Sequence, residues 1–145
     1  MTSHSVRPRS TAAVTAEFLT QTRRIYLNEK MPPLDANPSS YNGYSVGHWA
    51  GDTLVVRTLR IRDDARFFDF PQTRNRLITE RLRLTAPDRL EDRMKIEDPT
   101  MLLAPYEFTY GYKKDPPYKI MEYVCDDKRY VPGADGSVSP KVTPN

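Results

Sequence analysis

The chain has 145 residues, the size of one domain, with 38% hydrophobic and 28% charged residues, which is a globular composition. Its 22 basic and 19 acidic residues leave a formal charge of +3, too balanced for the basic footprint of a nucleic-acid-binding protein. No apolar run has the length needed to span a bilayer, and the single cysteine, Cys125, excludes an intrachain disulfide and a multi-cysteine zinc cluster. We therefore expect neither a nucleic acid nor a membrane as a partner.

Both ends of the chain differ in composition from its middle. Residues 1–20 are expected to form a flexible arm, because they begin with Ser, Thr, Pro and Arg and lack apolar periodicity. This arm has no apolar h-region, so no secretory signal peptide is predicted; the cytoplasm is favoured, with the periplasm as the alternative. Residues 127–145 return to loop composition and are expected to form a tail. Residues 21–126 are expected to form one β domain.

Apolar and polar residues alternate repeatedly along the chain, which indicates β-strands. The first extended segments are expected within 13–29, where 23–27 is the firmer half, before prolines interrupt the pattern. The next two strands are joined by a tight turn at Ala50-Gly51-Asp52. These two strands are expected over 44–49 and 52–61. Four more are expected over 75–85, 88–98, 105–114 and 118–125.

These strands predict an all-β fold. Short connections require antiparallel neighbours, and sharp alternation gives a sheet with one wet and one dry face. Six or seven such strands bury their dry faces by curling or stacking. We expect an antiparallel meander that closes into a small lipocalin-like β-barrel, with a β-sandwich as the alternative. The long connection 63–76 carries three phenylalanines and is expected to cap the barrel mouth as a lid or to plug its end as a short helix.

Five motifs occur in a fixed order along the domain: Arg-Arg-Ile-Tyr at 23–26, Gly-x-Ser-x-Gly-x-Trp-x-Gly-Asp-Thr-Leu at 43–54, Thr-Glu-Arg at 79–81, Asp-Pro at 98–99 and Glu-Tyr-Val-Cys at 122–125. Over residues 20–126 this pattern resembles a family of small bacterial proteins of unassigned function. Two positions depart from it. Ala50 stands where the family usually has an acidic residue, and His48 occupies a position that is often Arg or Lys in the family. The resemblance implies the domain boundaries and supplies no activity.

Three carboxylates share predicted strand faces with aliphatic residues. Alternation places Glu80, Asp92 and Glu122 on the dry sides of their strands. A carboxyl group in apolar surroundings has a raised pKa unless it is paired, which suits a general acid or base. The alternative is structural: an inward arginine or a tyrosine hydroxyl would hold such a carboxylate.

Histidine and aromatic side chains supply the other candidates. His48 shares a face with Tyr44 and Val46 and is expected to line the interior near Glu80 or Glu122 as a proton shuttle. Tyrosine hydroxyls inside a barrel can orient a ligand or polarise a carbonyl, and Tyr110 is the candidate for that role. The alternative is an ordinary aromatic core. The expected substrate-binding residues are Tyr44, Trp49, Phe68, Asp92, Tyr106, Phe108 and Tyr112.

No motif predicts a metal, a cofactor or a covalent nucleophile. Only His4 and His48 could supply imidazole ligands, and Ser45 in Gly-x-Ser-x-Gly is not followed by the helix that a nucleophile elbow needs. The leading hypothesis is a cofactor-free lyase, isomerase or cyclase that moves a proton on a small apolar or aromatic molecule, with Glu80 or Glu122 as base and His48 or Tyr110 as acid. The alternatives are a non-catalytic binding protein for a small hydrophobic ligand and a structural or homo-oligomerisation module.

Overall fold

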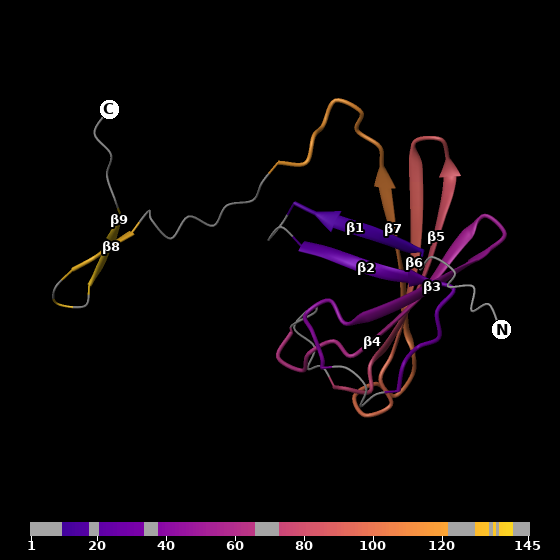
Figure 1. Cartoon of the computed structure of the whole chain (residues 1–145), viewed down its shortest axis with the longest axis horizontal. Coiled ribbons are helices and arrows are strands. Elements are labelled where there is room, and N and C mark those ends of the chain that lie inside the picture. Colours follow the sequence, from indigo (N-terminus) through magenta and orange to yellow (C-terminus); the bar gives the residue numbers. More distant parts are fainter. Residues whose placement is uncertain are drawn as a thin grey trace, which may run out of the picture.

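A computed structural model describes residues 10–17, 21–33, 38–65, 73–121, 130–133, 135 and 137–140, and its regular elements in these ranges are all strands (Figure 1). No helix of the described residues is long and apolar enough to cross a membrane. The prediction of an all-β chain is confirmed, and most strands lie within a few residues of the predicted ranges. They are β1 (Thr11–Ala16), β2 (Gln21–Leu27), β3 (Tyr44–Ala50), β4 (Thr53–Leu59), β5 (Leu77–Ala86), β6 (Arg89–Glu97), β7 (Tyr106–Lys113), β8 (Tyr130–Pro132) and β9 (Val138–Pro140).

Strands β1 to β7 form one sheet in sequential order, and β2 and β3 are its parallel pair. The expectation of purely antiparallel pairing is therefore wrong at this step, because the crossover at 28–43 is long enough to return the chain to the same end of the sheet. The two strands lie close together. A Cβ on Gly47 would stand 2.8 Å from Cγ2 of Ile25, so a side chain at this position would force Ile25 or the backbone beside it to shift.

The sheet curls into an open half-barrel (Figure 1). In the described residues β1 pairs only with β2 and β7 pairs only with β6, so these two strands are the edges of the sheet. The predicted closure into a lipocalin-like barrel is wrong, and the single curled sheet also differs from a two-sheet sandwich. Closure would need backbone pairing between the two edges. Instead, the β1–β2 hairpin runs across the inner face, where Arg23 of β2 contacts Glu80 of β5 and the hairpin lines a hollow together with β6 and β7.

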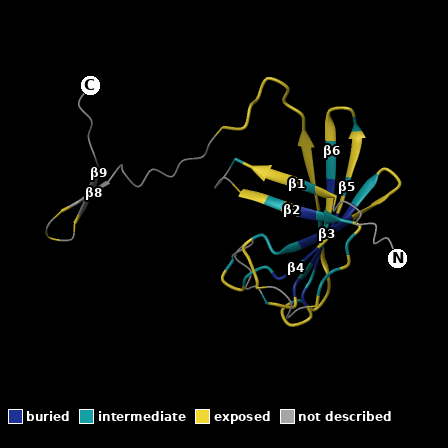
Figure 2. Cartoon of the chain, viewed as in Figure 1, coloured by how far each residue is buried: buried dark blue, intermediate teal, exposed yellow. Residues whose placement is uncertain are grey.

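The pairing register confirms the predicted alternation in β5, β6 and β7. Val56, Glu80, Met94 and Phe108 form one row across the inner face. Burial is deepest at one end of this face, as Figure 2 shows. The buried side chains of the inner face there are Ile25, Ser45, Val56, Thr58, Ile78 and Ile96.

Segments outside the predicted domain also take part in strands. Strand β1 lies within the expected N-terminal arm and belongs to the sheet, while β8 and β9 form a separate two-stranded sheet within the expected tail. The strand expected over 118–125 is not observed at 118–121, and its remainder lies outside the described residues. Here the Tyr118 hydroxyl donates to Oε2 of Glu17, and the Met121 amide lies 3.4 Å from the same oxygen. The chain after β7 thus reaches back to the end of β1.

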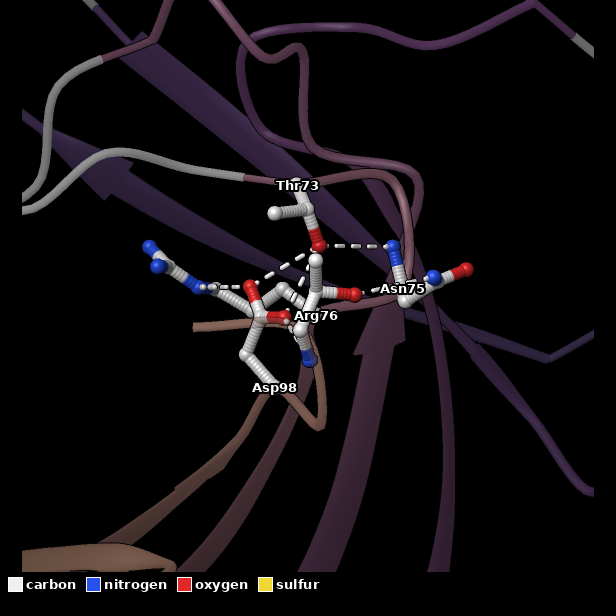
Figure 3. A network of polar contacts seen from close by, with 5 residues as sticks. Thr73, Asn75, Arg76 and Asp98 are labelled. Atoms are coloured by element: carbon white, nitrogen blue, oxygen red, sulfur yellow. Dashed lines mark hydrogen bonds and ion pairs between the residues drawn. The ribbon is translucent and has the colours of Figure 1, made fainter. Parts of the chain in front are cut away.

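A polar cluster around the buried Arg76 and Asp98 side chains fastens the β4–β5 connection to the β6–β7 loop (Figure 3). Thr73 Oγ1 lies 2.9 Å from both carboxylate oxygens of Asp98, and the Thr100 amide donates to Oδ1 of Asp98 at 3.2 Å. Nε of Arg76 lies 3.6 Å from Oδ2, and both side chains are buried. Asn75 Nδ2 donates to the Thr100 hydroxyl. Asp98 therefore holds two loops that are separate in the sequence.

Replacing Asp98 with Asn should reduce the free energy of unfolding by about 3 kcal/mol, because the buried Arg76 guanidinium loses its counter-charge. Urea unfolding at neutral pH measures this loss. Asp88→Asn changes an exposed acid in the β5–β6 turn and should shift stability by less than about 0.5 kcal/mol. Equal effects of the two substitutions would show that the Asp98 charge does not hold the loops.

Candidate functional site

A hollow of about 610 Å³ lies where the half-barrel opens, between the β1–β2 hairpin and strands β5 to β7. Small-molecule sites in proteins have volumes of this order. Most of its lining is apolar or aromatic, and three ionisable side chains, Arg23, Glu80 and Asp92, face it. The remaining lining residues are Val14, Thr15, Ala16, Gln21, Asn42, Leu82, Leu90, Met94, Tyr110 and Tyr112.

Arg23 and Glu80 form a two-pronged ion pair across this hollow. Nη1 of Arg23 donates to Oε2 of Glu80 at 2.8 Å, and Nη2 donates to Oε1 at 2.9 Å. The Glu80 side chain is only 4% exposed and that of Arg23 is 22% exposed. Glu80 thus lies on the inner face as predicted. Its contacts match the structural alternative to a general base, in which an inward arginine engages both carboxylate oxygens.

Asp92 lies beside this pair and lacks such a partner. It is 4% exposed, and it stands across from Leu82 on β5 and Tyr110 on β7. Its Oδ1 is buried and has no hydrogen-bond partner among the described residues. Burial is the main cause that raises the pKa of Asp92 from 3.8 to about 6, and the negative charge of Glu80 adds to it, while the positive charge of Arg23 opposes the shift. An unsatisfied buried carboxylate weakens a fold, and perturbed carboxyl groups of this kind concentrate at functional sites.

Tyrosines of β7 form the exposed wall of the hollow. Tyr110 and Tyr112 are 37% and 51% exposed and occupy alternate positions on the inner face. Partial burial of the ring is the main cause that raises the pKa of Tyr112, and the negative charge of Asp92 adds to it. The Tyr106 and Phe108 ring centroids are 5.4 Å apart, and those of Phe108 and Tyr110 are 5.2 Å apart. Tyr106 and Phe108 thus extend the row of rings on this strand but do not line the hollow.

His48 does not join this group. It pairs with Val55, whereas the next residue of β4, Val56, is the one that pairs with Glu80. His48 therefore points to the outer face, where it is exposed. The prediction that His48 lines the interior near Glu80 is wrong. The β3–β4 hairpin alternates as predicted, but the face that turns inward is the one with Gly47 and Trp49, not the one with His48.

The remaining predicted residues lie away from the hollow or outside the described residues. Tyr44 is on the outer face, stacked on Tyr26 with ring centroids 4.8 Å apart and with the Arg60 guanidinium 5.9 Å from its ring. Trp49 is on the inner face opposite Leu54, but it is 60% exposed and does not line the hollow. Two predicted residues, Glu122 and Phe68, lie outside the described residues.

Arg23 lines the hollow and contacts Glu80, but the sequence analysis did not assign it to the site. Its position contained a signal: Ile25 is an apolar residue of the same strand, and alternation places Arg23 two residues earlier on the same face. The pairing of Val14 with Arg23 likewise brings β1 to the hollow.

Among the described residues, no group of three or more His, Cys, Asp and Glu side chains could hold a metal ion. No protein-family model, curated protein or solved structure matches the chain. The family resemblance suggested by the five motifs therefore stays a prediction, and any functional proposal depends on the geometry of the hollow.

Asp92 should make the protein less stable as the pH rises. Because its folded pKa of about 6 exceeds its ordinary value of 3.8, the folded state binds more protons between these pH values. The stabilising contribution of protonated Asp92 is fully present below pH 3.8 and is lost as the pH rises through about 6. The free energy of unfolding falls by up to about 3 kcal/mol over this range. Asp92→Asn should remove this fall and be the more stable protein at pH 8, as measured by urea unfolding from pH 4 to pH 8.

Glu80→Gln provides the contrast on the same inner face. It leaves Arg23 without its carboxylate and should reduce stability at pH 8 by about 2 to 3 kcal/mol, less than for a fully buried pair because Arg23 is partly exposed. If Asp92→Asn were also destabilising at pH 8, the Asp92 carboxylate would have to be stabilised by a partner.

Proposed function

We propose that the hollow binds a small amphipathic molecule, whose apolar part packs on the lining and whose hydrogen-bond donor meets Asp92. The observation that carries this proposal is the Asp92 carboxylate, which lines a hollow of about 610 Å³ and whose buried Oδ1 has no hydrogen-bond partner among the described residues. A ligand donor at this carboxylate would offset the cost of leaving it without a partner.

The lining supports binding of an apolar body. Leu82, Leu90 and Met94 surround Asp92 on the inner face, and Val14 faces them from β1. Apolar walls with a few placed polar groups are typical of small-molecule sites. Exposed aromatic and aliphatic side chains also gather here: Val14, Tyr110 and Tyr112 are all more than a third exposed, and a bound molecule would cover them.

Leu90→Trp should fill part of the hollow and weaken ligand binding at least tenfold, because the larger ring takes the space of the apolar body. A library of small amphipathic molecules, screened by NMR with the full chain, supplies the ligands and the affinities. Thr109→Trp places the same ring on the exposed outer face of β7 and should leave affinity unchanged. Ligands that bind both variants equally well would place their site elsewhere.

Proton transfer on the bound molecule is the second candidate function, and the pKa of Asp92 favours it. A pKa of about 6 lets one carboxyl group accept and return a proton near neutral pH. In this version Asp92 takes the role of base that was predicted for Glu80 or Glu122, since Glu80 is engaged by Arg23. Tyr110, directly across from Asp92, is the candidate acid.

If Asp92 is the base, the full chain should catalyse exchange of an acidic carbon-bound hydrogen of its ligand in D₂O, as followed by NMR. The rate should rise with pH through about 6, where Asp92 ionises, and Asp92→Asn should lower it at least 100-fold, within the range of about 10² to 10⁴ for general bases. Exchange that persists in Asp92→Asn would assign the chemistry to another group; binding without exchange would leave a binding protein.

A further inference from the structure

The charges that face the hollow do not balance, and this concerns the ligand of the proposed small-molecule site. The ionisable residues that line it are Arg23 on β2, Glu80 on β5 and Asp92 on β6, with the tyrosines of β7 as the other titratable groups. Arg23 gives two of its nitrogens to Glu80. One positive and two negative groups leave an excess of one negative charge when Asp92 is ionised.

Nearby cations of the same strands do not neutralise this charge. Arg81 on β5 and Arg93 on β6 occupy opposite register positions, and both point to the outer face. Each is next in sequence to an inward carboxylate, Glu80 or Asp92. Both arginines are exposed to water, where solvent screens them. The Asp92 carboxylate is buried and thus the less screened charge.

The aromatic wall favours the same sign of charge. Tyr110 stands directly across from Asp92, and Tyr112 is the next inward residue of β7. The faces of aromatic rings carry partial negative charge and attract cations. A carboxylate flanked by exposed rings is a combination that recognises an ammonium group, since a neutral donor gains only the hydrogen bond.

We infer that the ligand of the hollow is a protonated amine with an apolar or aromatic body, whose ammonium group donates to the Asp92 carboxylate beside the Tyr110 ring and whose body packs on Leu82 and Leu90. This inference rests on the proposed small-molecule function and names its ligand class. A hydroxyl compound of the same shape would fill the same space and leave the negative charge uncompensated.

The test compares 2-phenylethylammonium with 2-phenylethanol, which differ in the polar group and share the body. NMR titrations of the full chain at pH 7.5 should show the ammonium compound binding at least tenfold more tightly, with the Leu82 and Leu90 methyl signals shifting. Asp92→Asn should abolish this preference, and unfolding measurements check that the variant is folded. Asp88→Asn, which removes an exposed acid of the β5–β6 turn, should preserve it. Lowering the pH to 5 should weaken binding of the ammonium compound and leave the alcohol unchanged.

The outcomes separate this inference from the proposed function. If the alcohol binds as tightly as the ammonium compound and Leu90→Trp weakens both, the hollow is a small-molecule site without preference for cations, and only the inference fails. If the ammonium compound binds but Asp92→Asn retains its preference, the inference fails because another group supplies the selectivity. If neither compound shifts the lining signals, the inference is overturned, and the library screen with Leu90→Trp decides the proposed function separately.

Discussion

The ion pair between Arg23 and Glu80 determines how the rest of the inner face is used. It joins β2 to β5, two strands separated in the sheet by β3 and β4, so it can form only if the sheet curls far enough to bring them face to face. The same contact holds the β1–β2 hairpin, whose first strand is mostly exposed, over the inner face of β5 to β7. Because the pair occupies Glu80, the neighbouring carboxyl group of Asp92 is left as the unbalanced charge.

In the proposed site, Asp92 illustrates a conflict between the stability of the fold and ligand binding. An aliphatic or amide side chain at this position would avoid the cost of ionising a carboxyl group that is 4% exposed. Natural proteins are not optimised for stability alone, and groups that weaken a fold often belong to its working site. The aliphatic neighbours that make Asp92 costly, Leu82 and Leu90, are the same residues that give the hollow its apolar lining.

Alternation of side chains along a strand is a local property, and the features that depend on it alone could be predicted from the sequence. The inward positions of Glu80, Asp92 and Tyr110 follow from it. The direction of neighbouring strands and the closure of the sheet do not, which is why the parallel step from β2 to β3 and the missing closure were not foreseen, although the sequential meander order was. His48 shows the same limit: alternation separates it from Trp49, but only the register with β4 and β5 decides which of the two faces inward.

The unpaired edges at β1 and β7 have a kinetic consequence. In a closed barrel, a bound molecule leaves through the mouth or by breaking a ladder of backbone hydrogen bonds. Here the wall is interrupted between the two edge strands, so departure from the proposed site requires no strand to separate from its neighbour. Dissociation rates set most differences in affinity between related complexes. For the proposed small-molecule site, an open wall of this kind favours rapid release of the ligand over long-term storage.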